Sequence, residues 1–321
     1  MRLSPGMHSS KKVLFAVETL LTRLGLVVLP ALPRWAVLAC ARAAGTIAYW
    51  TAPQQRRITL SNLDVAFGDS LAPQAKQRIA RGAFYTMALV MLDLFWFSRH
   101  IEQRIRRYVT LDPAIRTHVY TQPMIGVTAH FGNWELLSKA LSVYGFAHVA
   151  VATPLANPTV DAIIGMGRSI PGVEIVTRQG AIRGLLRALR QKKHVALLLD
   201  QNTKPDEGGL FVGFFGLSIP MSTAAAVLSE RTEAPVIPIF CRANINGSYT
   251  IYSLPPLKRA DLVQAGPNII HTITQTIATL FEQEIRSHPE QWLWMYKRWK
   301  YIDPDWPAAA YPFYAKPLHQ G

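Results

Sequence analysis

A histidine and a glutamate five positions apart are the strongest chemical signal in the chain. His130 and Glu135 lie in the segment Met124-Ile-Gly-Val-Thr-Ala-His-Phe-Gly-Asn-Trp-Glu135. On one continuous helix this spacing would turn the two side chains roughly 140° apart. If instead a strand ends at His130, Gly132 makes a turn and Asn133 caps a following helix, both side chains converge above the strand's carboxyl end. Open α/β sheets bind their ligands at that position.

The pair has the parts of a general base. Glu135 would fix the tautomer of the His130 imidazole and stabilise the imidazolium that forms on proton transfer. The chain has no G-x-S-x-G nucleophile elbow, so the base would deprotonate a substrate hydroxyl for direct transfer without a covalent enzyme intermediate. The alternative is a purely structural pair, with His130 an ordinary turn histidine.

Polar residues also follow two other apolar segments. Arg178 comes after residues 173–176 and could stabilise negative charge that develops in a transition state. Without further support, its position favours an ordinary surface arginine. Asp200 and Gln201 come after residues 194–199 and could hydrogen-bond sugar hydroxyls or position the loop that carries Arg178. A structural cap or turn is the alternative for both.

A basic stripe occupies one predicted helix and the residues after it, and no acid occurs between 178 and 193. The stripe could bind lipid phosphates or an acidic carrier protein, and its ordinary interpretation is a solvated helix face. Its cations are Arg183, Arg187, Arg190, Lys192 and Lys193.

Aromatic and basic residues alternate near the C-terminus. The mixture suits a membrane interface, where amphipathic rings and cations lie at headgroup depth. A C-terminal strand that caps the sheet is the alternative. The segment contains Trp292, Trp294, Tyr296, Lys297, Arg298, Trp299 and Lys300.

The alternation of apolar runs and helix-length stretches predicts the framework. It indicates an α/β fold with a mostly parallel central sheet flanked by helices. Asn246-Gly247, between two further apolar runs, predicts a hairpin and therefore one antiparallel strand pair at an edge of the sheet. The expected strands are 124–129, 147–153, 173–176, 194–199 and 235–240, and the expected helices are about 74–97, 133–144, 158–169, 180–191, 221–231 and 265–287.

Residues 1–52 predict an N-terminal helical membrane anchor, which leaves 53–321 as the α/β domain. The run 13–29 is largely apolar but contains two charged residues, Glu18 and Arg23, which makes it a marginal membrane span. Eight cations and one acid within residues 1–60 suit an anionic cytoplasmic leaflet. A secretory signal peptide is disfavoured because no clean small-residue cleavage site follows. A buried helical hairpin in a soluble protein is the alternative.

Composition excludes several other classes. Of the 321 residues 50% are apolar and 17% charged, which excludes disorder, and the net charge of +14 should attract anions. Two cysteines exclude a disulfide scaffold and a cysteine-based zinc site. The usual motifs of nucleotide hydrolysis, dinucleotide redox chemistry and zinc proteolysis are absent. Nucleic-acid binding is disfavoured because the cations lie among apolar helices and no recognised motif accompanies them.

The segment His-Phe-Gly-Asn-Trp-Glu at 130–135 resembles the H-x-x-x-x-D/E signature of glycerolipid acyltransferases. More closely, it resembles the form found in bacterial lipid A biosynthesis acyltransferases of the lauroyl and myristoyl type, within the lysophospholipid acyltransferase-like superfamily. The resemblance covers most of the chain, and several matches in the right order are more specific than one motif. The other matches are Arg56, Asn62-Leu63, Ala66-Phe67, Arg178-Gln179-Gly180, Val195-Ala-Leu-Leu-Leu-Asp200-Gln201, Phe211-Val212, Phe214-Phe215-Gly216 and Trp294-Met295-Tyr296-Lys297-Arg298-Trp299.

The resemblance implies an inner-membrane O-acyltransferase, on the cytoplasmic face, that moves a fatty acyl chain to a hydroxyl of a lipid A precursor. The donor would be an acyl carrier protein or CoA thioester, with no other cofactor and no metal. His130 would be the general base assisted by Glu135, and Arg178 would hold the oxyanion. The residues expected to bind substrate are Asn133, Arg183, Asp200, Gln201, Lys297 and Arg298.

Three other functions stay open at this point. The acceptor could be another glycolipid or lysophospholipid, such as a phosphatidylinositol mannoside. The chain could instead be a non-catalytic peripheral protein that binds anionic lipid, or a hydrolase in which the His–Glu pair activates water. The acyl chain length, the choice of donor and the hydroxyl acylated are not fixed by these motifs.

Overall fold

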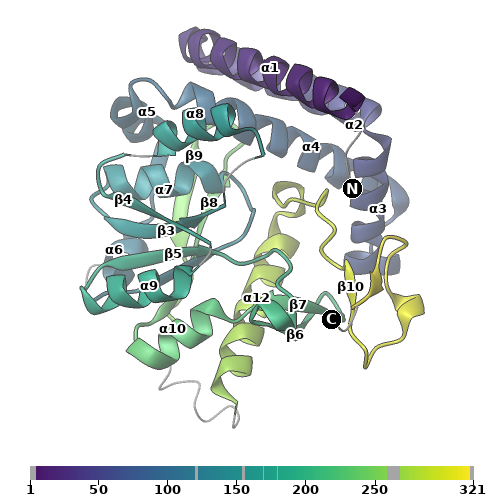
Figure 1. Cartoon of the computed structure of the whole chain (residues 1–321), viewed down its shortest axis with the longest axis vertical. Helices are drawn as coiled ribbons and strands as arrows, with labels where there is room; N and C mark the ends of the chain where they lie inside the picture. Colours follow the sequence, from purple (N-terminus) through teal and green to yellow (C-terminus); the bar gives the residue numbers. More distant parts are fainter. Residues whose placement is uncertain are drawn as a thin grey trace.

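The computed structural model describes residues 5–119, 122–153, 156–168, 170–178, 180–258 and 268–318. Four long helices come first, and strands and helices then alternate (Figure 1). The helices are α1 (Pro5–Val28), α2 (Arg34–Thr51), α3 (Pro53–Phe67), α4 (Pro73–Trp96), α5 (Ile101–Tyr108), α6 (Pro113–Val119), α7 (Trp134–Val143), α8 (Pro158–Arg168), α9 (Ala181–Arg190), α10 (Ala224–Thr232) and α12 (Ile269–Ser287). The strands are β1 (Val109–Leu111), β2 (Ile125–Thr128), β3 (His148–Ala152), β4 (Val173–Thr177), β5 (His194–Leu198), β6 (Gly209–Phe214), β7 (Leu217–Ser222), β8 (Val236–Ala243), β9 (Tyr249–Ser253), β10 (Tyr301–Ile302) and β11 (Lys316–Pro317).

The central sheet has seven strands in the order β1-β9-β8-β2-β5-β3-β4. Neighbouring strands from β8 to β4 pair in parallel, which confirms the predicted α/β class and its five strands. The Asn246-Gly247 hairpin is also confirmed, because β8 and β9 are antiparallel and Gly247 has a φ of 81°. The expectation that this pair forms the edge was wrong, since β1 adds to β9 in parallel and is itself the edge strand.

Two apolar clusters cover the two faces of the sheet. One joins the β2 and β5 side chains Val127, Val195 and Leu197 to the helices α9, α10 and α12. The other packs Met124, Ile237 and residues of α7 against the helices α2 and α4. Proline at the first position of α3 and of α4 starts each helix without losing a backbone hydrogen bond.

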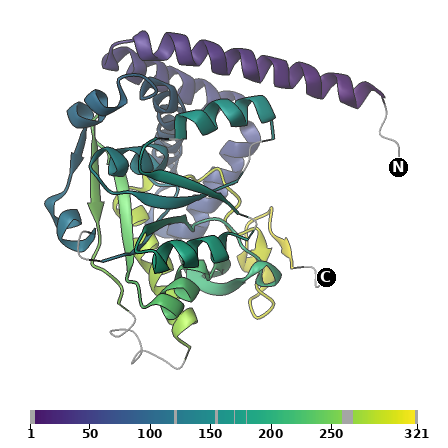
Figure 2. The same cartoon turned by 60° about the vertical axis from the view of Figure 1, so that its left-hand side comes forward.

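Two described helices are long and apolar enough to cross a membrane, and they differ in burial. The window Lys12–Ala31, which includes most of α1, has a mean hydropathy of 1.8 and is only 11% buried. The helix α4 has a mean hydropathy of 1.3 and is 44% buried, because it packs against α2 and α7. Figure 2 shows α1 extending beyond the α/β body as an arm.

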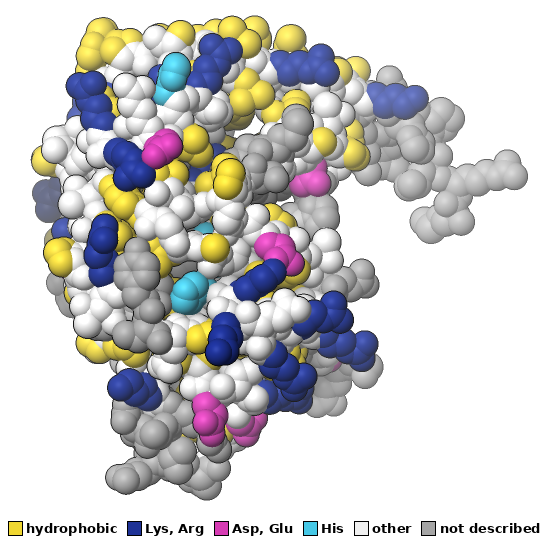
Figure 3. Space-filling model, turned by 90° about the vertical axis from the view of Figure 1, so that its left-hand side faces the viewer, with side chains coloured by type: hydrophobic (Ala, Val, Ile, Leu, Met, Phe, Trp, Pro, Cys, Tyr) yellow, Lys and Arg dark blue, Asp and Glu magenta, His cyan; other side chains and the backbone are white. Residues whose placement is uncertain are grey.

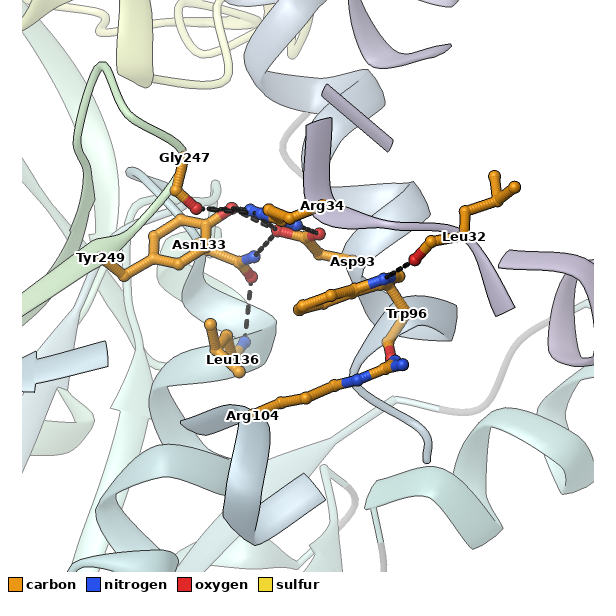
Figure 4. A network of polar contacts seen from close by, with 9 residues as sticks. All are labelled: Leu32, Arg34, Asp93, Trp96, Arg104, Asn133, Leu136, Gly247 and Tyr249. Atoms are coloured by element: carbon orange, nitrogen blue, oxygen red, sulfur yellow. Dashed lines mark hydrogen bonds and ion pairs between the residues drawn. The ribbon is translucent and has the colours of Figure 1, made fainter. Parts of the chain in front are cut away.

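A buried ion pair connects the N-terminal helices to the sheet (Figure 4). Arg34, the first residue of α2, forms a bidentate pair with Asp93 of α4, and their side chains are 6% and 1% exposed. Arg34 also donates to the Gly247 carbonyl at 2.8 and 3.0 Å, and the hydroxyl of Tyr249 donates to Asp93. Asn133 approaches the same carboxylate at 3.4 Å. The network therefore joins α2, α4, the β8–β9 hairpin and the start of α7.

The connection between α1 and α2 is held by residues at and after the end of α4. The Trp96 indole donates to the Leu32 carbonyl at 2.9 Å, and Arg104 donates to the Pro30 carbonyl at 2.6 Å. The position of α1 relative to the body is therefore fixed at its C-terminal end.

We expect Asp93→Ala to lower the free energy of unfolding by about 3–5 kcal/mol, because it leaves the Arg34 cation buried without its charge partner. The measurement is denaturant unfolding of the detergent-solubilised protein. Glu102→Ala is the matched control, since the Glu102–Arg106 pair is exposed and should contribute less than about 1 kcal/mol. Equal losses in the two variants would contradict the assignment.

Candidate active site

The segment from His130 to Trp134 is a tight turn between β2 and α7. Gly132 has a φ of 58°, and a Cβ atom added there would lie 2.0 Å from the carbonyl oxygen of Cys241, so no other residue fits. The Asn133 side chain accepts from the Leu136 amide at 2.9 Å and caps α7. The predicted strand–turn–helix arrangement is therefore confirmed.

The imidazole of His130 is held by Asp200, which follows β5. Asp200 Oδ1 lies 2.7 Å from His130 Nδ1, and Oδ2 accepts from the His130 amide at 2.9 Å. The indole of Trp292 donates to Oδ2 at 2.8 Å. We expected Glu135 to orient His130 and Asp200 to bind substrate, but the observed contacts give the orienting role to Asp200.

This contact fixes the tautomer of His130. A carboxylate only accepts hydrogen bonds, so Nδ1 carries the proton and Nε2 keeps its lone pair. Nε2 lies 3.3 Å from the amide nitrogen of Gln201. Burial of Asp200 would raise its pKa, but the contacts from His130 and Trp292 outweigh this effect, and the pKa of Asp200 lies below its usual value. Asp200 therefore stays ionised beside the His130 imidazole and can stabilise the imidazolium that forms when His130 acts as a general base.

A cavity of about 770 Å³ opens at His130, and residues from both faces of the sheet line it. Paired residues of parallel strands point to the same face, as do residues two apart in one strand. The register therefore places alternate residues of β2, β3, β4 and β5 on the floor of the cavity. Trp134, Leu137 and Ser138 of α7 line its other side.

Part of the cavity floor is apolar and exposed. Ile175 and Leu198 line the cavity and remain 42% and 38% exposed. Apolar side chains in a cavity of this size suit an apolar ligand. Polar groups gather near the carboxyl ends of the strands, where His130, Glu135 and Gln201 line the same cavity.

Of the other predicted site residues, only Arg178 lines the cavity. Its side chain is 57% exposed and lies 3.4 Å from Glu207. Arg183 is exposed on α9 and is not among the residues that line the cavity. Within the described ranges, no group of three or more His, Cys, Asp or Glu side chains could hold a metal ion.

Arg298 and Lys297 support the site from outside the cavity. Arg298 is 1% exposed and donates to the Asn202 side chain at 2.8 Å and to the Pro220 carbonyl at 3.1 Å. The Asn202 side chain in turn donates to the Lys297 carbonyl at 2.9 Å. These contacts hold the loop that carries Asp200 and Gln201.

The interfacial interpretation of residues 292–300 was wrong. Trp292, Trp294 and Trp299 are 2%, 0% and 0% exposed, and they pack with Phe214 and Phe215 in one aromatic cluster. The alternation of rings and cations reflects a segment that is buried at every aromatic position except Tyr296. No signal in the chain marked Trp292 as a partner of the site.

Comparison with known proteins identifies the relatives of the chain. Residues 7–301 match the family model described as bacterial lipid A biosynthesis acyltransferase. The chain is 25% identical over 256 residues to the lipid A biosynthesis palmitoleoyltransferase of Escherichia coli, which covers 77% of this chain and 79% of that protein. It is 22% identical over 262 residues to the lipid A biosynthesis lauroyltransferase of the same organism, with 80% and 82% covered. It is also 25% identical over 175 residues to the phosphatidylinositol mannoside acyltransferase of Mycobacterium tuberculosis, with 53% and 52% covered.

We expect the stability that Asp200 contributes to depend on pH. Because its folded-state pKa is depressed, the contribution is present above the pKa of an unfolded aspartate, about 3.9, and is lost as the pH falls through the lower folded-state value. Denaturant unfolding at a series of pH values should show the advantage of wild type over Asp200→Asn shrinking in acid. The exposed Asp206 supplies the control, Asp206→Asn, which should change stability little because exposed ion pairs contribute little. A difference between wild type and Asp200→Asn that is independent of pH would contradict the assignment.

Proposed function

Because the chain belongs to the bacterial lipid A biosynthesis acyltransferase family, we propose that it moves a fatty acyl group from a carrier thioester to a hydroxyl of a lipid A precursor. The donor in this proposal is an acyl carrier protein or CoA. The observation that carries it is the His130–Asp200 pair at one end of a cavity with an exposed apolar floor. A base for the acceptor hydroxyl and a place for the acyl chain are thereby adjacent.

In the proposed reaction His130 Nε2 removes the proton from the acceptor hydroxyl. The oxygen attacks the thioester carbonyl, and the tetrahedral intermediate collapses with loss of the thiolate, which takes the proton from the imidazolium. The new ester bond and the free thiol balance the broken thioester and O–H bonds. Asp200 stabilises the imidazolium between these steps, as a buried carboxylate does for the histidine of a catalytic triad.

Two further groups have proposed roles at the same end of the cavity. Arg178 lines the cavity, and we propose that its positive charge stabilises the oxyanion that develops in the transition state. Glu135 lies in the first turn of α7 and lines the cavity. We propose that Glu135 contacts the acceptor or the imidazolium. Asn133 acts as the helix cap rather than as a ligand for substrate.

The assay of acyl transfer has two other outcomes, in which the acceptor is a different glycolipid or water. The similarity to a phosphatidylinositol mannoside acyltransferase supports a different glycolipid acceptor with the same chemistry. Water as the acceptor would make the protein a thioesterase. The mass of the acylated product distinguishes all three.

We expect His130→Ala and Glu135→Ala to abolish acyl transfer, and Asp200→Asn to lower kcat by about a hundredfold or more, since general-base catalysis contributes about 10²–10⁴. The assay follows transfer from an acyl thioester to lipid A precursor by mass spectrometry. His271→Ala is the control, because His271 is exposed on α12 and is not among the residues that line the cavity. Full transfer by His130→Ala would remove the catalytic assignment.

We also propose that α1 and the outer face of α2 bind the cytoplasmic face of the inner membrane, with residues 1–52 as the anchor. The α2 residues Trp35, Ile47 and Trp50 are 72%, 61% and 61% exposed. Arg56 and Arg81 lie 5.4 and 5.9 Å from the Trp50 ring. Exposed tryptophans beside cations are typical of headgroup depth, and Figure 3 shows basic and apolar side chains together along the N-terminal arm.

Cys40 offers a direct test of this orientation. It is exposed on α2, whereas Cys241 is fully buried, so a thiol reagent should modify Cys40 alone. We expect anionic vesicles to slow this modification several-fold, while neutral vesicles slow it less because the cationic helices gain less from them. Deletion of residues 1–33 should weaken vesicle binding. Equal modification with and without vesicles would contradict the proposed orientation of α2.

A further inference from the structure

The outer side of α9 carries three arginines that the proposed reaction does not use. Arg183, Arg187 and Arg190 recur at helical spacing, and all three are exposed. At 1.5 Å per residue they extend over about 10 Å of the helix. They form no ion pair with any residue in the described part of the chain. These three residues are called the basic face of α9 below.

The stability of the helix does not account for the whole basic face. Like charges three or four positions apart on a helix repel one another. The helix dipole favours Arg187 and Arg190 in the last turn of α9, but it disfavours a cation such as Arg183 in the first turn. Arg183 therefore adds to the repulsion without a compensating contact within the helix.

The excess of positive charge in the chain does not account for it either. Two other helices pack on the same face of the sheet as α9, and both mix the two signs of charge. In α12, Arg286 pairs with Glu282 at 2.8 Å. In α10, Glu230 precedes Arg231. The helix α9 differs from these neighbours, because its sequence contains no acid.

The basic face lies outside the cavity, on a helix that helps to form the cavity wall. Ala181, Ile182 and Leu185 of α9 line the cavity, as does Arg178 just before the helix. At about 100° per residue, these three α9 side chains and the basic face lie on opposite sides of the helix. A partner bound to the basic face therefore sits beside the cavity and leaves its interior free.

The basic face also points away from the proposed membrane contact. The helices α9, α10 and α12 cover one face of the sheet, whereas α2 and α4 pack on the other. Figure 1 shows α1 above the strands β3, β4 and β5, and α9 below them. With α1 and α2 in the bilayer, a partner that reaches the basic face comes from solution.

The spacing of the arginines fits a protein surface better than one small anion. A small anion is bound where several donors converge on it, and these side chains are instead distributed along an exposed helix. Charges of this kind match complementary charges on a partner protein and speed its association. The partner should therefore be a soluble protein with an acidic surface.

We infer that the basic face of α9 docks the acidic surface of the acyl carrier protein that delivers the thioester. The inference rests on the proposed function, since the carrier is the acyl donor, and it selects the carrier protein over CoA. The body of the carrier stays against α9, while its acyl chain enters the cavity past Arg178. Reversal of charge on α9 should then impair the protein-bound donor alone.

The test compares an acyl carrier protein with acyl-pantetheine, a donor that has the same thioester and no protein. Arg187→Glu combined with Arg190→Glu should lower kcat/KM for the acyl carrier protein about tenfold, mainly through KM, because charges at a docking surface govern encounter. Transfer from acyl-pantetheine should be unchanged, which shows that the variant is folded. The loss should shrink at an ionic strength of about 1 M, where the Debye length is about 3 Å.

Two further variants separate docking from general charge effects. Arg183→Gln removes a charge at the other end of the basic face and should act in the same direction by a smaller factor. Arg99→Glu combined with Arg107→Glu makes the same change in net charge at two exposed positions beside and within α5. This control should leave transfer from the acyl carrier protein unchanged.

Full transfer from the acyl carrier protein by the Arg187→Glu, Arg190→Glu variant would overturn the docking surface. Equal losses with acyl carrier protein and acyl-CoA would also overturn it, since the arginines would then bind a phosphate that both donors carry. Loss of binding to anionic vesicles without any loss of carrier-dependent transfer would assign the basic face to lipid. A wild type that uses acyl-CoA but not the carrier would overturn the inference and leave the acyltransferase proposal standing. Absence of transfer by the wild type with every donor would instead overturn the proposed function.

Discussion

One buried carboxylate joins the parts of the site that the chain supplies from distant positions. Asp200 accepts from the amide of His130, from its imidazole and from the indole of Trp292, and so connects the end of β2, the end of β5 and the C-terminal segment. A carboxylate that is 4% exposed needs such partners, because an isolated buried charge is strongly disfavoured. The same contacts that make its burial tolerable orient the imidazole toward the cavity.

The two faces of the sheet differ in the size of their side chains. On one face, large side chains such as Val127 and Leu197 pack under α9, α10 and α12 and contribute to stability. On the other, the register partners Gly126, Ala150 and Ala196 have small side chains or none, and they line the cavity. Side chains alternate along β2, so Gly126 and Thr128 lie on the α7 side of the sheet, while Val127 packs in the apolar cluster with α9, α10 and α12.

Local sequence patterns predicted the turn at His130. They did not predict that Asp200 is the residue that contacts the His130 imidazole. The strand, Gly132 and the Asn133 cap are all local features. Asp200 is seventy positions away from His130, and its choice over Glu135 follows from β5 lying beside β2, which the sequence does not state. The β6–β7 hairpin was missed for a local reason, because its turn begins at Phe215, which takes the left-handed conformation usually marked by asparagine. The buried tryptophans were assigned to a membrane interface because a mixture of aromatic and basic residues is also found in this core segment.

The bond from Asn157 to α1 has a consequence for how lipids reach the protein. Asn157, just before α8, donates to the Phe15 carbonyl and to Glu18, both at 3.0 Å. If α1 lies in the membrane as proposed, this contact keeps α8 next to the bilayer surface. A lipid acceptor would then arrive by lateral diffusion within the leaflet. Turnover would follow the number of acceptor molecules per unit area of membrane and not their bulk concentration, so dilution with inert phospholipid would slow the enzyme at constant total acceptor.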